Sequence, residues 1–168
     1  MLTGTRAMAA LRKRLSDGCV LAGTSAGASA FSSTMIMGGE TGLNVREDAV
    51  QLGTGLGIIT RLIIDQHFAQ RHRLGRLLSA VALEPERLGV GIDEDTAMVY
   101  HGNGRLEVIG SGQVFVVDGS EAVLRKRPPE RRFSLSGAVL HVLNDGDVFD
   151  VPSRRLLAEG SPVREPVG

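Results

Sequence analysis

The 168-residue chain has little of several residue types, and each shortage excludes a class of protein. Its single cysteine, Cys19, cannot form an internal disulfide, and no Cys/His spacing indicates a zinc site. Tryptophan is absent and aromatic residues make up 4%, which argues against the base-stacking surfaces of single-strand nucleic-acid binders. Nineteen basic residues balance nineteen acidic ones, so the basic excess of a nucleic-acid-binding domain is missing.

Long apolar runs are also missing. No run reaches the roughly 18 residues of a membrane span, and residues 1–14 lack the apolar stretch and cleavage site of a signal peptide. We therefore expect a cytoplasmic protein with no membrane and no nucleic-acid partner; secretion would require a signal upstream of this sequence. An apolar content of 42% supports one domain over residues 1–168, with 152–168 as a peripheral tail.

The first third of the chain predicts a helix, a buried strand and a loop. Apolar residues recur at helical spacing over Thr5–Leu15. Cys19–Ala22 is a short, continuous apolar run bounded by glycines, which is typical of a central strand covered on both faces. Small residues after Gly27 indicate a tightly packed helix start, and the glycine-rich stretch Thr41–Gly57 favours a loop.

The rest of the chain predicts one helix among several strands. The elements expected from apolar spacing and turn residues are a strand at Ile58–Ile64, a helix at Arg71–Leu83, a strand at Leu88–Ile92, a β meander at Ala97–His101, Leu106–Ile109 and Val114–Val117, a polar connector at Leu124–Ser134 and a last strand at Val139–Leu143.

The pattern Gly23-x-Ser25-x-Gly27 after an apolar run is that of a nucleophile elbow. A serine on so sharp a turn needs small neighbours, because adjacent elements approach its backbone closely. The turn also leaves the Ala26 N–H free to donate a hydrogen bond to a developing oxyanion. The alternative is that Ser25 is only the N-cap of a short helix.

Two later segments offer partners for a nucleophilic serine. His67 follows a predicted strand within Asp65-Gln66-His67-Phe68, where a general base could lie. Asp93-Glu94-Asp95 follows the next strand and could supply the acid that orients a histidine. Spacing alone does not choose among the three acids, and such a cluster is also compatible with a solvated turn.

Three arginines, Arg71, Arg73 and Arg76, follow His67 closely. The planar guanidinium fork suits carboxylates, so a cluster beside a nucleophile would favour an acidic substrate. At about 100° per residue the three cannot share one helical stripe, and some should lie in the loop before the helix. The alternative is the exposed face of a basic helix.

Taken in order, three segments resemble the cyanophycinases, a family of serine exopeptidases related to aspartyl dipeptidase: Gly23–Ala28, Asp65–Arg76 and Gly91–Ala97. The resemblance extends from Thr3 to about Val117. It implies hydrolysis of cyanophycin, a poly-aspartate chain that carries arginine on each side-chain carboxyl, to β-Asp-Arg dipeptides. It also implies that no metal or cofactor is needed.

Carried over by motif, the resemblance makes Ser25 the nucleophile, His67 the base and Glu94 the acid, in preference to its acidic neighbours. It also implies substrate-pocket positions at Asp65, Gln66, Arg71, Arg73 and Arg76. One departure is His72, which stands where the family pattern leads us to expect glycine.

The fold that we expect is α/β: a doubly wound, mostly parallel sheet with a nucleophile elbow, similar to class I glutamine amidotransferases, followed by a C-terminal β meander. Such a sheet places βα units of roughly 30 residues each before a central elbow strand. Here a single helix precedes it, so we expect the chain to be N-terminally truncated relative to the family. The family's upstream Gly-Gly-Asp-Gln-like segment, which looks like the source of a second oxyanion donor, has no counterpart.

The expected partner is cyanophycin or another β-aspartyl peptide, and we expect a homodimer. Two alternatives stay open at this stage. The chain could be an inactive or partner-dependent piece of such an enzyme, or a related peptidase that acts on other β-aspartyl or acidic peptides.

Overall fold

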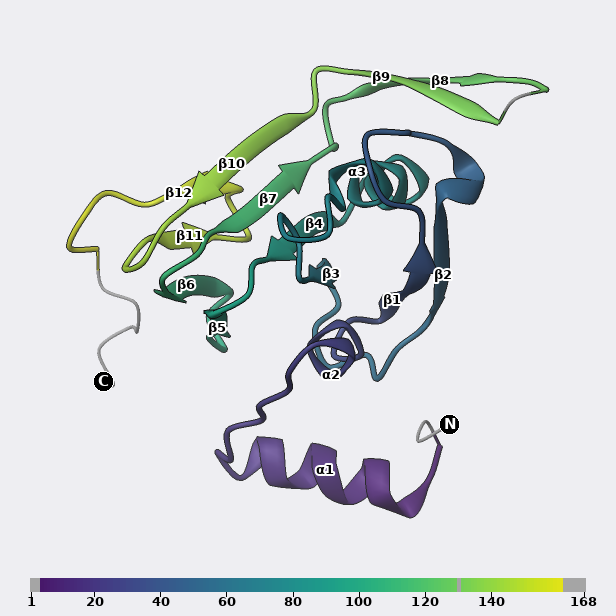
Figure 1. Cartoon of the computed structure of the whole chain (residues 1–168). Coiled ribbons are helices and arrows are strands. Elements are labelled where there is room, and N and C mark those ends of the chain that lie inside the picture. Colours follow the sequence, from purple (N-terminus) through teal and green to yellow (C-terminus); the bar gives the residue numbers. More distant parts are fainter. Residues whose placement is uncertain (1–3, 130, 162–168) are drawn as a thin grey trace.

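A computed structural model describes residues 4–129 and 131–161 of the chain (Figure 1). Its helices are α1 (Arg6–Ser16), α2 (Ala26–Ser29), α3 (Leu74–Leu83) and the 3-10 turn η1 (Glu47–Ala49). Its strands are β1 (Thr34–Gly39), β2 (Val50–Thr54), β3 (Leu62–Gln66), β4 (Leu88–Ile92), β5 (Thr96–Tyr100), β6 (Arg105–Gly110), β7 (Val114–Asp118), β8 (Val123–Arg127), β9 (Arg132–Ser136), β10 (Val139–Leu143), β11 (Val148–Asp150) and β12 (Arg155–Leu156).

The central sheet has the strand order β10-β7-β4-β3. One face packs against α3, and the other packs against a second sheet of order β12-β11-β6-β5 (Figure 1). The alternation of side chains along β3 explains this layering: Ile63 joins the α3 side, whereas Leu62 and Ile64 join the core between the sheets. The protein is therefore α/β, with β3 and β4 buried between two covering layers.

The predicted doubly wound, mostly parallel sheet is not what the described strands form. Within them β3 and β4 are the one parallel pair, and the other ladders are antiparallel. The meander also divides, because β5 pairs with β6 while β7 crosses to pair with β4 and β10. The run Val114–Val117 is apolar at every position, which suits a strand covered on both faces better than the half-exposed β5–β6 hairpin.

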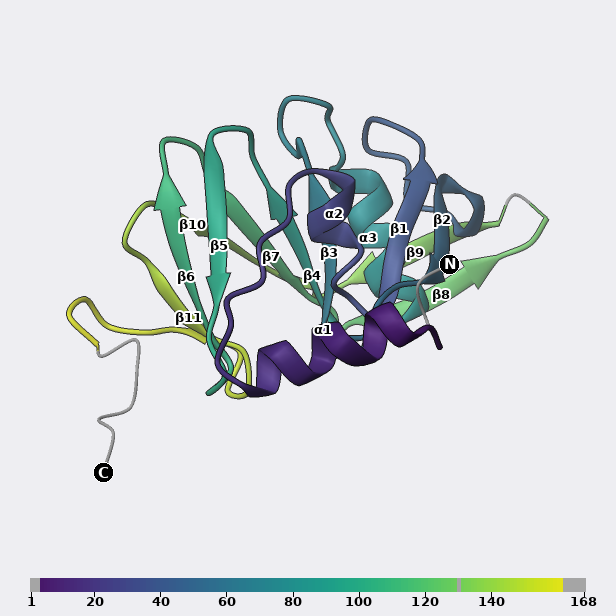
Figure 2. The same ribbon diagram turned by 90° about the horizontal axis from the view of Figure 1, so that it is seen from below.

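The prediction of a central strand at Cys19–Ala22 is wrong. These residues form no ladder, and Val20 is 94% exposed. An apolar strand is stable when neighbouring strands bond its backbone and other elements cover its faces. Neither condition holds in the part of the chain that the structure describes, where the segment runs from α1 to α2 beside β5 (Figure 2).

Two predicted loops are β-hairpins. In the first, β2 lies within the predicted loop Thr41–Gly57 and pairs with β1, which lies just before it; η1 is in the connection between them. This hairpin buries Ile36 and Val50 against α3. The second is Leu124–Ser134, where β8 pairs with β9. Glycines and charges suggested loops, but the buried apolar residues of each hairpin, including Phe133, outweigh those local signals.

The remaining expectations mostly hold. The helices expected at Thr5–Leu15 and Arg71–Leu83 occur as α1 and α3, although α3 begins at Leu74, and α2 is only four residues long. The strand expected at Val139–Leu143 is β10, but β11 and β12 follow it. Of the predicted tail, β12 joins the edge of the second sheet, and residues 162–168 lie outside the described residues.

Candidate active site

Residues 19–24, between α1 and α2, form no helix or strand and are called the extended segment (Figure 2). Ser25 lies on a strained turn between this segment and α2. Its φ of 51° and ψ of −123° fall outside the regions that residues with a side chain ordinarily occupy. Gly23 is required here, because a Cβ atom at that position would lie 2.7 Å from the Phe31 ring. A Cβ atom on Gly27 would meet nothing within 4 Å, so the second motif glycine faces open space. The turn presents the Ser25 hydroxyl to solvent.

A chain of two hydrogen bonds connects Ser25, His67 and Glu94. The Ser25 Oγ lies 2.9 Å from His67 Nε2, and His67 Nδ1 lies 2.8 Å from Glu94 Oε1. His67 follows β3 with a φ of 48°, and Glu94 follows the parallel neighbour β4. The carboxyl ends of two adjacent parallel strands therefore bring the imidazole and the carboxylate to one edge of the sheet, as the sequence predicted.

The geometry separates the three acids that spacing left equivalent. Asp93 is buried, and its carboxylate accepts hydrogen bonds from the Ala69 N–H at 2.9 Å and the Gln113 N–H at 3.3 Å. Asp95 is exposed with a φ of 52°. Of the three acids, only Glu94 forms a hydrogen bond with the His67 imidazole in the described part of the chain. Asp93 instead connects the loop that follows β4 to the loop that follows β3.

Two further groups lie beside the Ser25 hydroxyl. The Ala26 N–H has no acceptor among the described residues, so it can donate to an oxyanion formed at a carbonyl attacked by Ser25. The Gln66 side-chain oxygen lies 3.4 Å from Ser25 Oγ and accepts a hydrogen bond from Arg73 Nη1 at 3.0 Å. Arg73 also donates to the Gln66 backbone carbonyl, which fixes both ends of that residue.

The predicted pocket residues Asp65 and Arg76 form a buried ion pair. The Asp65 side chain is fully buried, and the Arg76 guanidinium donates to both of its carboxylate oxygens, with the Nε bond at 2.6 Å. Arg73 adds a longer contact of 3.5 Å to the same carboxylate. Burial, followed by the charge of Arg76, lowers the pKa of Arg73, although Asp65 opposes the shift. Arg71 is exposed on the turn before α3.

This ion pair gives a stability prediction. We expect Arg76→Met to lower the free energy of unfolding by about 3 to 5 kcal/mol, because the buried Asp65 carboxylate would lose its bidentate partner. Arg71→Ala, the exposed arginine of the same cluster, should change it by less than about 0.5 kcal/mol. Urea unfolding measures both, and the double variant Asp65→Asn/Arg76→Met should recover part of the loss. A cost for Arg76→Met as small as that for Arg71→Ala would contradict the prediction.

His72 has a φ of 50°, in the left-handed region that glycine occupies most easily. The unexpected histidine therefore keeps a backbone conformation that costs about 1 kcal/mol or more with a side chain present. We expect His72→Gly to raise the unfolding free energy, whereas His72→Ala, which keeps the strain, should not. Chemical denaturation of the two variants checks this, and equal effects would show that the backbone is not the cause.

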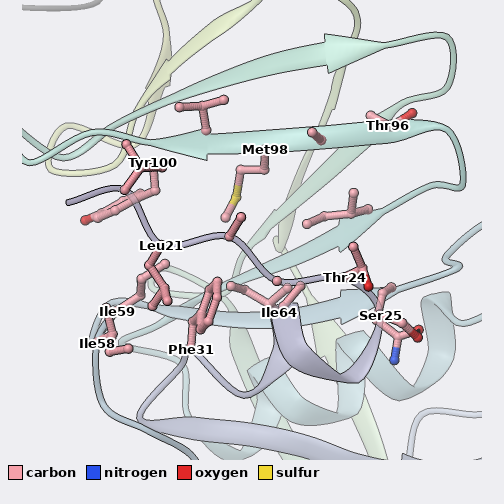
Figure 3. Close-up of a pocket in the computed structure, with 18 of the residues that line it drawn as sticks. Leu21, Thr24, Ser25, Phe31, Ile58, Ile59, Ile64, Thr96, Met98 and Tyr100 are labelled. Atoms are coloured by element: carbon pink, nitrogen blue, oxygen red, sulfur yellow. Dashed lines mark hydrogen bonds between the residues drawn. The ribbon is translucent and has the colours of Figure 1, made fainter. Parts of the chain in front are cut away.

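A cavity of about 1230 Å³ opens beside these groups (Figure 3). Ser25, Gln66, His67 and Glu94 line it at one end, whereas Asp65, Arg71, Arg73 and Arg76 are not among its lining residues. Its other walls are mainly apolar, which sequence reasoning missed; they include Leu21, Phe31, Ile58, Ile59, Ile64, Met98 and Tyr100. Burial raises the pKa of the Tyr100 hydroxyl, although Arg61 opposes the shift.

The described residues offer little sign of a metal or membrane site. Within 4–129 and 131–161, no group of three or more His, Cys, Asp or Glu side chains is arranged to hold a metal ion. None of the helices in the same ranges is long and apolar enough to cross a bilayer.

Comparisons with known proteins agree with the motif resemblance. The chain is 42% identical over 161 residues to the cyanophycinase of Trichormus variabilis, which covers 94% of this chain and 54% of that protein. It is 41% identical to the cyanophycinase of Geminocystis herdmanii, over 94% of this chain and 60% of the relative. For the cyanophycinase of Synechococcus elongatus the identity is 36%, over 93% and 50%. The chain thus spans about half the length of the curated relatives it matches.

The resemblance to cyanophycinases is therefore confirmed along nearly the whole chain. A family model described as peptidase family S51 matches residues 1–108, which include the elbow, the β3 loop with His67 and the β4 loop with Glu94. Because that match covers well over half of the sequence and all three motifs, this chain belongs to peptidase family S51.

Proposed function

We propose that this protein is a serine-type exopeptidase that hydrolyses cyanophycin to β-Asp-Arg dipeptides through Ser25, His67 and Glu94. The observation that carries the proposal is the pair of bonds at 2.9 Å and 2.8 Å joining the three side chains, with the serine on a strained turn. A serine hydroxyl is activated when a base accepts its proton and an acid, bonded to the other side of the base, orients that base. The proposed substrate is taken from the names of the curated relatives, which are cyanophycinases.

In this mechanism His67 Nε2 removes the Ser25 proton as Oγ attacks the carbonyl of the scissile α-peptide bond. The negative charge forms on the carbonyl oxygen, where the Ala26 N–H donates a hydrogen bond. His67 then protonates the leaving amine, and an acyl-enzyme forms on Ser25. Water, deprotonated by His67, then attacks the ester carbonyl of the acyl-enzyme, and His67 returns the proton to Ser25 Oγ as the acyl product leaves. Glu94 holds the imidazole in the tautomer that both steps need and stabilises its charged form.

We further propose that Gln66 takes part in substrate binding, because it lines the cavity next to Ser25. Arg71 is a second candidate, since it is exposed on the turn that follows His67 and can pair with a substrate carboxylate. For Asp65, Arg73 and Arg76 the buried ion pair supports an indirect role, in which Arg73 holds Gln66 in place. A cytoplasmic location and a homodimer stay predictions.

The substrate proposal is tested with a panel. Purified protein is incubated with cyanophycin, with β-aspartyl dipeptides that carry residues other than arginine, and with matched α-aspartyl dipeptides, and products are identified by mass spectrometry. We expect β-Asp-Arg from cyanophycin at the highest rate. Faster cleavage of the other β-aspartyl peptides would favour the related peptidase instead.

A further inference from the structure

The cavity is larger than the catalytic groups require. Its volume of about 1230 Å³ exceeds the roughly 300 to 1,000 Å³ of ordinary ligand pockets. Figure 3 shows Ser25 at one end and Tyr100, Leu21 and Ile58 at the other, with Met98 and Ile64 between them. The volume beyond the catalytic end is thus bounded mainly by aliphatic and aromatic side chains, although Arg12, His101 and Asn103 also line the cavity. These apolar walls do not suit the charged units of cyanophycin.

The main chain around this cavity lacks hydrogen-bond partners. The backbone N–H groups of residues 20–24 bond no acceptor in the part of the chain that the structure describes. In the same part, β5 pairs only with β6, and β3 pairs only with β4. The unpaired segment and the free edge of β5 therefore border one apolar cavity, and unpaired backbone beside an apolar cavity is the combination that binds an added strand.

The side chains of the extended segment point to the same conclusion. Val20 is 94% exposed, which is the highest exposure of any large apolar side chain among the described residues. Leu21 lies between the walls formed by β3 and β5 (Figure 3). The segment follows α1, which is fastened to the body by Arg12, whose Nη2 donates to the carbonyls of Leu56 and Gly57. Both of these long-range bonds are exposed to solvent.

We propose that this cavity, with the edge of β5, binds an apolar β-strand from a polypeptide equivalent to the part of the relatives that this chain does not match. The relatives are about twice as long as the matched region, since 94% of this chain corresponds to 54% of the Trichormus variabilis protein. Backbone groups of the segment and of the β5 edge would bond the added strand, and its alternate side chains would fill the cavity. The binding does not depend on the proposed hydrolysis.

Cys19 makes the proposal directly testable, because it is exposed, lines the cavity and is the one cysteine of the sequence. The chain is co-expressed with the unmatched part of the Trichormus variabilis cyanophycinase as a separate tagged polypeptide. We expect a one-to-one complex on affinity capture and light scattering. In that complex, the alkylation of Cys19 should be slowed about tenfold or more relative to the chain alone, because a bound strand covers the segment.

A pair of valine variants locates the surface. Val20→Asp should weaken the complex about tenfold or more, because a bound strand would desolvate the new charge. Val123→Asp, on the exposed hairpin strand β8 and 59% exposed, should bind as the parent does. No captured complex, or equal effects of the two variants, would overturn the proposal. So would a homodimer of the chain alone that protects Cys19 and is abolished by Val20→Asp, because a second copy would then occupy the cavity.

Discussion

Ser25→Gly is expected to be more stable than Ser25→Ala and equally inactive. Both variants lose the hydroxyl and its bond to His67, so hydrolysis should fall by on the order of 10⁶-fold if Ser25 is the nucleophile. Only glycine adopts a φ of 51° with a ψ of −123° without strain. After the extra chain entropy of glycine is subtracted, the difference in unfolding free energy should be about 1 kcal/mol in favour of glycine.

Initial rates with cyanophycin and urea unfolding of the same preparations measure the two effects. Thr24→Ala is the matched control, because Thr24 is the adjacent exposed hydroxyl and lines the same cavity. It should retain most of the activity. If Ser25→Ala keeps the parent's rate, Ser25 is not the nucleophile. If alanine is as stable as glycine at this position, the strain attributed to the elbow is not stored there.

Glu94→Gln should lower kcat by roughly 10⁴-fold while leaving KM nearly unchanged. A glutamine amide fits the same space, but its NH₂ can donate to His67 Nδ1 and place the imidazole proton on Nε2. The ring then faces Ser25 as a donor and cannot accept the hydroxyl proton. Steady-state kinetics over a range of cyanophycin concentrations separates kcat from KM.

Asp95→Asn provides the control for Glu94→Gln, because Asp95 is the adjacent exposed acid and asparagine tolerates its φ of 52°. It removes the same charge one residue away, so a general electrostatic effect would lower both rates. We expect the rate of Asp95→Asn to match that of the parent. Similar losses in the two variants would contradict an orienting role specific to Glu94. Asp93→Asn is unsuitable as a control, since its carboxylate ties two loops together.

Two of the candidate catalytic residues, His67 and Glu94, could be predicted because each follows an apolar strand. A polar residue directly after a buried strand must lie at one edge of a sheet, and the strands β3 and β4 are neighbours in parallel. His67 thus needed no knowledge of long-range packing beyond this rule. Ser25 was predicted from the Gly23-x-Ser25-x-Gly27 pattern, although the apolar run before it forms no strand. The choice of Glu94 from three consecutive acids came from family resemblance, and the hydrogen bond to His67 agrees with it.

The sequence was less informative where a segment depends on distant partners. Cys19–Ala22 has the composition of a buried strand, but composition does not supply the neighbours that would pair with it. Likewise, the arginines after His67 share one chemistry and one stretch of sequence, yet Arg76 is buried against Asp65 while Arg71 is exposed. The difference arises because α3 begins at Leu74, so Arg76 lies in the helix and Arg71 lies in the turn before it. The spacing of apolar residues did not determine this first residue of the helix.

Digestion of cyanophycin by the parent protein and by Ser25→Ala, with mass spectrometry of the products, tests the central claim most directly. If Ser25, activated by His67, carries the reaction, the parent releases β-Asp-Arg and the variant releases essentially none. Equal release of dipeptide by the two proteins, or intact cyanophycin after incubation with the folded parent, would contradict the claim that this chain is a working serine peptidase.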